Sequence, residues 1–258
     1  MRVFALSDIH VDFQVNADWI RALSQFDYRD DLLILAGDVS NKLADVAWSL
    51  GALAARFKHL LFVPGNHELW VLGEHSYRNS LDKFADVMRI AEQSGASMQP
   101  FFHEGTLIAP LLGWYDYSFG EPGEDLKNAW TDFHACRWPE RFGAGDIAAY
   151  FTTMNRASMS HSPRRPEVTK LITFSHFMPR IDLIPDYVPV KYRMLDPVLG
   201  SAMLEQQLRR LDSNIHVYGH SHINRRVHID GVTYINNALG YPSETRMTAR
   251  QLLRIDEL

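Results

Sequence analysis

Short, continuous apolar runs alternate with segments of helical periodicity in the N-terminal part of the chain. Leu32–Ala36 reads LLILA, and an apolar run of this length without alternation is typical of a strand buried on both faces. Leu43–Phe57 follows it with apolar residues at helical spacing, and His59–Val63 is again strand-like. This order predicts βαβ units and a mostly parallel sheet, which is an α/β fold.

The same patterns predict the remaining elements. Gly95 stands where a helix C-cap is expected, and Asp230-Gly231 is a strong hairpin signal. We predict strands at Val3–Leu6, Leu32–Ala36, His59–Val63, Phe101–Phe102, Thr106–Leu112, Lys170–Ser175, Ile215–Tyr218, Arg225–Ile229, Val232–Ile235 and Gln251–Ile255, and helices at Ala17–Phe26, Leu43–Phe57, Tyr77–Ser94 and Leu199–Leu211. Prolines indicate a surface loop at Ser162–Pro166 and an extended loop at Pro179–Pro197.

Length and charge narrow the class of protein. The 258 residues suit one domain over 1–258, and ten aromatic residues within 113–151 predict an ordered insertion or cap at about 113–166. A net charge of −5 argues against nucleic acid as a partner. The single cysteine, Cys136, rules out an intrachain disulfide, and no apolar run approaches the roughly 18 residues of a membrane span. We therefore expect a cytoplasmic protein with no membrane partner; the oligomeric state stays open.

Five of the predicted strands run directly into a compact polar cluster. These clusters are Ser7-Asp8-Ile9-His10, Gly37-Asp38, Gly65-Asn66-His67-Glu68, Ser175-His176 and Gly219-His220-Ser221-His222. Because the carboxyl ends of parallel strands meet at one edge of a sheet, we expect the five clusters to converge in space.

The polar clusters contain the side chains that divalent metals bind. Seven potential ligands, none of them a thiolate, are Asp8, His10, Asp38, Asn66, His176, His220 and His222. Two ions that share a bridging carboxylate use such a set better than one ion does, and mixed nitrogen and oxygen ligands favour Mn, Fe or Zn over calcium. Any one of these histidines alone is more often an ordinary residue, but the five clusters together favour a metal centre.

The five motifs resemble those of the calcineurin-like metallophosphoesterases, whose pattern is D-x-H, G-D, G-N-H-[DE], a lone H and G-H-x-H. The resemblance spans residues 8 to 222. It implies a four-layer α/β/β/α sandwich of two mixed sheets with flanking helices, and a dinuclear centre. In that centre Asp8, His10 and His222 would hold one metal, Asn66, His176 and His220 the other, and Asp38 would bridge both.

One departure separates the chain from the protein Ser/Thr phosphatases of that family. Those enzymes continue as G-D-x-V-D-R-G, whereas this chain has Asn41 and Lys42 at the acidic and arginine positions. The resemblance therefore favours the small-molecule and phosphodiesterase branches. It also leaves open which residue pairs with His67.

The implied mechanism follows from charge. Two metals about 3.5–4 Å apart bind a bridging hydroxide at neutral pH and clamp the phosphate oxygens. Asn66 and His67 are the candidates to contact the substrate, and His67 is the candidate to protonate the leaving group. The alternative for His67 is a supporting role that fixes the turn at Asn66.

Three further residues are weaker candidates for substrate binding. Trp114 and Tyr115 open the aromatic segment and could stack a ring over the metals, although a second small core is the favoured explanation because aromatic residues mostly lie in cores. Arg225 lies close after His222 and could reach a phosphate, or it is a solvated hairpin residue.

The leading hypothesis is a metal-dependent phosphoesterase, a phosphoric ester hydrolase that acts on a small phosphorylated molecule. Its cofactors would be two divalent ions. The alternative within enzymes is a cyclic-nucleotide phosphodiesterase or a nuclease, and the alternative outside enzymes is a metal-binding scaffold without activity. Metal analysis and the hydrolysis of an aryl phosphate and an aryl phosphodiester discriminate among these hypotheses.

Overall fold

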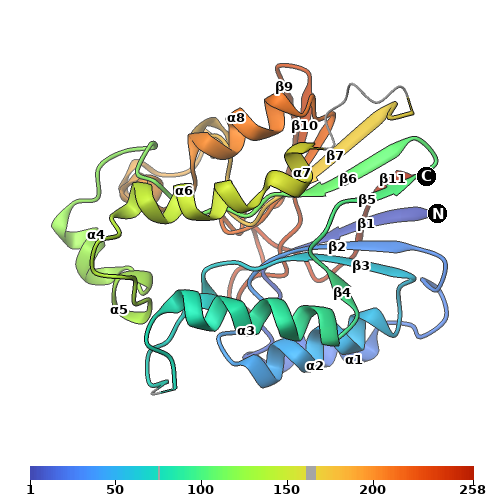
Figure 1. The fold of residues 1–258 in the computed structure, drawn as a ribbon, viewed down its shortest axis with the longest axis horizontal. Helices are drawn as coiled ribbons and strands as arrows, with labels where there is room; N and C mark the ends of the chain where they lie inside the picture. The colour runs from blue at the N-terminus through green and yellow to red at the C-terminus, as the bar shows by residue number, and fades with distance from the viewer. Residues whose placement is uncertain (75, 161–166) are drawn as a thin grey trace.

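Two β-sheets lie face to face in the middle of the molecule, and helices cover the outer face of each sheet (Figure 1). The computed structural model describes residues 1–74, 76–160 and 167–258. The first sheet has the strand order β11-β1-β2-β3-β4 and the second has the order β5-β6-β7-β8-β10-β9. The strands are β1 (Arg2–Leu6), β2 (Leu32–Ala36), β3 (His59–Val63), β4 (Ala96–Ser97), β5 (Phe101–His103), β6 (Thr106–Pro110), β7 (Lys170–Phe174), β8 (Ile215–Tyr218), β9 (Arg225–Ile229), β10 (Val232–Asn236) and β11 (Leu253–Glu257).

Both sheets are mixed. The central pairs β1–β2, β2–β3, β6–β7, β7–β8 and β8–β10 are parallel, whereas β11, β5 and β9 pair antiparallel at the edges. The helices are α1 (Gln14–Ala22), α2 (Leu43–Ala54), α3 (Ser80–Gln93), α4 (Glu124–Ala129), α5 (Asp132–Ala135), α6 (Ala144–Met154), α7 (Arg156–Ser160) and α8 (Ala202–Arg210), with short 3₁₀ segments η1 (His67–Leu69), η2 (Ile181–Leu183) and η3 (Val190–Val198).

Three apolar cores separate the four layers. In β2, Leu33 and Leu35 pack into the core beneath α1, α2 and α3, whereas Leu32, Ile34 and Ala36 face the second sheet. A strand between two such layers has no polar face, which is why its sequence is a continuous apolar run. The predicted α/β fold with four layers is confirmed.

The strands match their predicted bounds better than the helices do. Four strands, β2, β3, β8 and β9, have the predicted bounds. Helix α1 begins at Gln14 and ends at Ala22, earlier than the predicted Ala17–Phe26. The prediction of an extended loop at Pro179–Pro197 was wrong, because η2 and most of η3 lie there; Pro185 and Pro189 stand outside both 3₁₀ segments. The two-residue strand β4 was missed because its sequence is too short to show a pattern.

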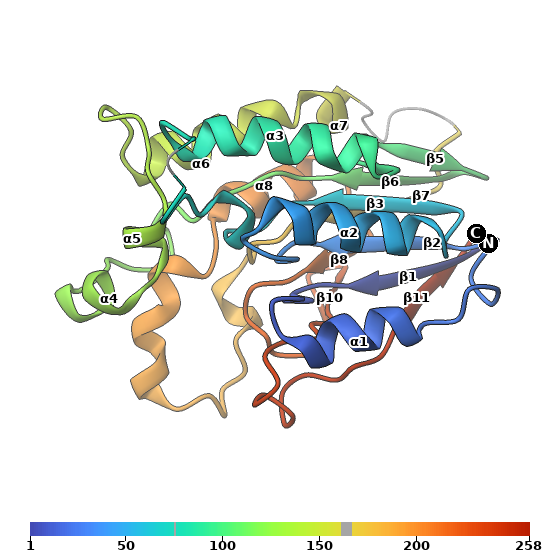
Figure 2. The ribbon, with the colours of Figure 1, turned by 90° about the horizontal axis from the view of Figure 1, so that it is seen from below.

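The aromatic-rich segment 113–166 forms the connection from β6 to β7 and carries α4 to α7. Helix α6 buries Ile147, Ala148 and Phe151 in the core that covers the second sheet, so this part of the segment is one of the outer layers. Helices α4 and α5 extend beyond the sheets at the end opposite both chain termini (Figures 1 and 2). The predicted loop at Ser162–Pro166 lies outside the described residues.

The parallel strands β1, β2, β3, β6, β7 and β8 end on the side of α4 and α5 (Figure 1). The loops that follow β1, β2, β3, β7 and β8 contain the polar clusters noted above. Within the described ranges, no helix is long and apolar enough to cross a membrane.

Candidate metal centre

The loops that follow β1, β2, β3, β7 and β8 bring the predicted ligands together. Two groups of side chains each place one potential ligand atom per residue within 4.8 Å of the others: Asp8, His10, Asp38 and His222 form one group, and Asp38, His176 and His220 form the other. Asn66 joins the second group through its Oδ1, 3.1 Å from His176 Nε2. The carboxylate of Asp38 therefore belongs to both groups.

The ligand atoms converge closely inside each group. The Nε2 atoms of His10 and His222 lie 3.1 Å apart, and His222 Nε2 is 3.3 Å from Asp8 Oδ1. In the second group His176 Nε2 is 3.1 Å from His220 Nδ1 and 3.4 Å from Asp38 Oδ2. Imidazole nitrogens and carboxylate oxygens that share one point, without a thiolate, fit divalent ions such as Mn, Fe or Zn.

Five of these residues have a left-handed backbone. The φ angles are 50° at Asp8, 37° at His10, 56° at Asp38, 68° at His220 and 51° at His222. Such angles are uncommon for residues other than glycine and cost of order 1–3 kcal/mol each, so they persist only where surrounding contacts impose them. Because these residues are concentrated in the loops of the centre, we infer that the conformational cost is tolerated in order to orient their side chains toward it.

The buried carboxylate of Glu68 connects the two loops that follow β2 and β3. It accepts backbone N–H bonds from Gly65 at 2.6 Å, Val39 at 2.6 Å, Asp38 at 3.1 Å and Ser40 at 3.2 Å. Four such bonds satisfy a carboxylate that burial would otherwise destabilise. Glu68 therefore fixes Asp38 against the Asn66 turn, a role that its place in the motif did not reveal.

Three of the candidate ligand histidines are oriented by a hydrogen bond on the ring nitrogen that faces away from the centre. The contacts are His176 Nδ1 to Ala36 O at 2.9 Å, His220 Nε2 to Val198 O at 3.0 Å and His222 Nδ1 to Glu244 Oε2 at 2.6 Å. Each acceptor requires a proton on that nitrogen, which leaves the other nitrogen free for a metal. No sequence pattern pointed to Glu244.

Asp132 orients the amide of Asn66. Its Oδ1 accepts a hydrogen bond from Asn66 Nδ2 at 2.8 Å, which turns Asn66 Oδ1 toward His176. The indole N–H groups of Trp70 and Trp130 donate to the same carboxylate at 2.6 and 2.8 Å. Asp132 lies in the aromatic-rich segment, and no sequence pattern connected it with the centre.

The electrostatics of the centre fit a cation. Burial and the charges of Glu68 and Asp8 raise the pKa of Asp38 well above its ordinary value. At His222 burial acts to lower the pKa, but Asp8 and Glu244 outweigh it and raise the pKa to about 10. Buried carboxylates therefore draw positive charge to this centre, and divalent ions at the two ligand groups would supply it.

His67 lies beside the ligand groups but belongs to neither. Its Nε2 is 3.8 Å from Asp38 Oδ2 and 3.4 Å from the hydroxyl of Tyr241, and its ring stacks on Trp70 at 3.7 Å. Burial, then the charges of His176 and His222, lower the pKa of His67 to about 3, so the ring is neutral near pH 7. The partner that the sequence left open is thus Tyr241, in the loop after β10.

The other predicted residues lie elsewhere. Trp114 and Tyr115 are only 1 % and 3 % exposed and pack in the core over the second sheet, so neither ring is open to a substrate. Tyr115 instead supports Asp132 by a hydrogen bond. Arg225 donates from Nη1 to Leu183 O at 2.6 Å. Asn41, at the position that departs from the Ser/Thr phosphatases, accepts a bond from Lys83 Nζ through its carbonyl oxygen.

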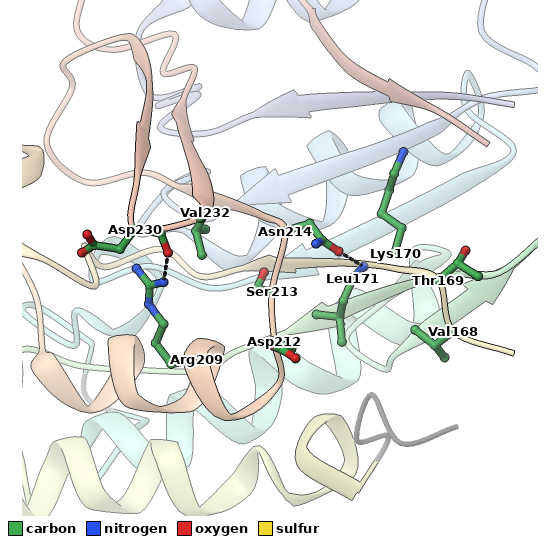
Figure 3. Close-up of a pocket in the computed structure, with 11 residues that line it drawn as sticks. Val168, Thr169, Lys170, Leu171, Arg209, Asp212, Ser213, Asn214, Asp230 and Val232 are labelled. Carbon is green, nitrogen blue, oxygen red and sulfur yellow. Dashed lines mark hydrogen bonds between the residues drawn. The ribbon is translucent and has the colours of Figure 1, made fainter. Parts of the chain in front are cut away.

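A separate cavity lies at the amino-terminal ends of β7 and β8, whereas the metal-ligand groups lie at the carboxyl-terminal ends (Figure 3). It is lined by Lys170 and Leu171 at the start of β7, by Asn214 just before β8, and by Arg209 and Asp230. Arg209 donates to the carbonyl of Asp230, and Asn214 Oδ1 accepts from Leu171 N at 2.8 Å, so these polar groups are already paired. The strands separate this cavity from the metal-ligand groups, and it offers no comparable set of ligands.

Comparison with known proteins agrees with this geometry. The family model for calcineurin-like phosphoesterases matches residues 1–224. The chain is 27 % identical over 265 residues to the [acyl-carrier-protein] phosphodiesterase PptH of Mycobacterium tuberculosis, covering 95 % of this chain and 79 % of that protein. It is also similar to the crystal structure of phosphopantetheinyl hydrolase (PptH) from the same organism, with a TM-score of 0.79 and 24 % identity over 98 % of this chain and 95 % of the other.

Gly65 tests how tightly the centre is packed. A Cβ atom at this position would lie 2.2 Å from Asp38 Oδ1 and 2.7 Å from the His176 ring, so both ligands must move in Gly65→Ala. We expect Mn²⁺ binding, measured by calorimetry, to weaken by at least about tenfold. Gly51→Ala is the control, because a Cβ there meets nothing within 4 Å and alanine favours the helix. Wild-type Mn²⁺ affinity in Gly65→Ala would contradict the arrangement.

Asp132 tests the second ligand group separately. In Asp132→Ala both oxygens that accept from Asn66 and the indoles are lost, and we expect one of two Mn²⁺ binding steps to weaken by about 10–100-fold. The other step should persist, because no hydrogen bond of the described residues joins Asp132 to Asp8, His10 or His222. Asp125→Ala, at an exposed position in α4, is the control. Equal weakening of both steps, or of neither, would rule out this role.

Proposed function

This chain belongs to the calcineurin-like phosphoesterase family, and we propose that it cleaves the phosphodiester that links a phosphopantetheinyl group to a carrier protein. As a member of that family it is a phosphoric ester hydrolase. The observation that carries the proposal is the pair of ligand groups that share Asp38. The choice of substrate is supported by the relative PptH, which is named a phosphodiesterase of acyl carrier protein.

We infer that two divalent ions, Mn, Fe or Zn, occupy the two groups. Asp8, His10, Asp38 and His222 would hold one ion, and Asp38, Asn66, His176 and His220 the other. Such a pair lowers the pKa of water and stabilises the charge that develops on phosphate oxygens. The single cysteine of the chain supports a reducing, cytoplasmic location.

The chain's own groups act on the leaving oxygen. His67 is partly exposed at the edge of the ligand groups, whereas all seven ligands are buried, so it can contact a bound ester. Its neutral ring carries one N–H group. We assign that group to the oxygen that leaves the phosphorus, to which it donates a hydrogen bond as negative charge develops there. Trp70 holds the ring by stacking, and the Tyr241 hydroxyl faces Nε2.

The proposed activity is tested with a carrier protein that bears its phosphopantetheinyl group. After loading with Mn²⁺, the enzyme should release the phosphopantetheinyl group. The mass of the carrier protein, measured by intact-protein mass spectrometry, should fall by the mass of that group. Removal of metal with a chelator should abolish the reaction, and Mn²⁺ should restore it. An enzyme that hydrolyses p-nitrophenyl phosphate but leaves the carrier protein unchanged would contradict the proposal.

Replacement of His67 separates chemistry from metal binding. His67→Ala should keep its metal and fold yet lose about 10²–10³-fold in turnover on the carrier protein, because an alkoxide leaving group depends on that hydrogen bond. The loss should be much smaller for bis(p-nitrophenyl) phosphate, because nitrophenolate is a stable anion that needs little stabilisation. The matched control is His228→Ala, which removes an exposed imidazole on β9.

Two results would move His67 out of the leaving-group role. Equal losses on both substrates would make it a positioning residue. Loss of bound metal, measured by elemental analysis, would place it among the ligands.

A further inference from the structure

An apolar cavity of about 670 Å³ adjoins the metal centre on the side of η2 and η3. One wall is the segment between β7 and α8, including Ile184, Val188 and Leu199. The other wall comes from the loops after β8 and β10, including Ile223 and Met247. Cavities of this volume commonly hold small organic ligands.

Two residues join this cavity to the ligand groups. Ser221 lines it and stands in the sequence between the ligands His220 and His222. Glu244 also lines it, while its Oε2 accepts the hydrogen bond from His222 Nδ1 at 2.6 Å. These contacts place the cavity beside the loop that carries His220 and His222, next to the side of the His222 ring that carries Nδ1.

The four charged residues of this lining, Arg193, Asp196, Glu244 and Arg246, have no net formal charge together, and Arg246 is exposed. Arg193 Nε is 2.8 Å from Asp196 Oδ2, and Glu244 is engaged by His222 and by the backbone N–H of Tyr241 at 2.8 Å. An anionic ligand would meet these carboxylates, and a cationic one would compete with existing ion pairs. The cavity therefore favours a neutral occupant that buries alkyl groups against its walls.

Building on the proposed function, we propose that this cavity binds the neutral, flexible organic arm of the substrate, a chain of alkyl and amide groups such as pantetheine. The phosphoryl group would lie at the metal centre and the arm along Ile184, Val188 and Ile223. Alkyl segments of the arm would pack against the apolar side chains of the walls. The amides can face the solvent or the hydroxyls of Tyr187 and Tyr192, two exposed residues of the lining. The cavity then determines which phosphodiesters are good substrates.

The test compares two diesters that have the same leaving group. One is methyl p-nitrophenyl phosphate and the other is 4′-pantetheinyl p-nitrophenyl phosphate, so that both release nitrophenolate and differ only in the arm. For the wild-type enzyme we expect kcat/KM to be at least about tenfold higher with the pantetheinyl arm, chiefly through KM. No preference for the arm would overturn the proposal.

Val188 and Val190 provide matched variants. Val188→Trp fills the cavity and should remove the preference for the arm while leaving hydrolysis of the methyl diester unchanged. Val190 is 85 % exposed and outside the cavity lining, so Val190→Trp should keep the preference. Met247→Trp, on the opposite wall, should repeat the effect of Val188→Trp and guards against a folding defect in one variant.

Several outcomes would overturn the assignment of the cavity. One is an equal loss of kcat/KM on both diesters in Val188→Trp and Met247→Trp. Another is a loss of the preference for the arm in Val190→Trp as large as that in Val188→Trp. The third is a higher kcat/KM for thymidine 5′-p-nitrophenyl phosphate, which carries a nucleoside arm, than for the pantetheinyl diester. Failure of the proposed function looks different. In that case the carrier protein stays intact, while the preference between the small diesters, and its loss in Val188→Trp, still report on the cavity.

Discussion

The centre depends on one buried carboxylate that is not itself a ligand. Glu68 accepts hydrogen bonds from four backbone N–H groups in the loops that follow β2 and β3, and so fixes the position of Asp38 relative to the Asn66 turn. The four hydrogen bonds offset the free-energy cost of removing the Glu68 carboxylate from water. Asp38, placed in this way, is shared by both ligand groups.

Around that contact the molecule supports its ligands with a layer of fixed partners. Carbonyl oxygens and Glu244 orient the histidines, and Asp132 orients Asn66. Because the supporting groups come from loops far apart in the chain, the centre forms only when both sheets have packed. The left-handed backbone at five ligands shows that this support outweighs local conformational preference.

The convergence of the candidate ligands could be predicted from the sequence, because they follow apolar strands directly and the topology alone brings them together. The fold class could also be predicted, because continuous apolar runs such as Leu32–Ala36 indicate strands that are buried on both faces. The supporting residues Asp132, Glu244 and Tyr241 were not predicted. Each comes from an irregular segment with no periodicity, and each acts through a contact across more than 20 residues or between separate loops. For the same reason the burial of Trp114 and the 3₁₀ turns of 179–197 emerged only from the structure.

We infer that the two ligand groups bind two ions through the shared carboxylate of Asp38. Anomalous diffraction from crystals of the Mn²⁺-loaded protein, together with elemental analysis of the same preparation, locates and counts the bound ions. We expect two Mn²⁺ per chain, about 3.5–4 Å apart, near the Asp38 carboxylate. A single fully occupied ion, with His176 and His220 turned away from it, would show that the centre is not dinuclear.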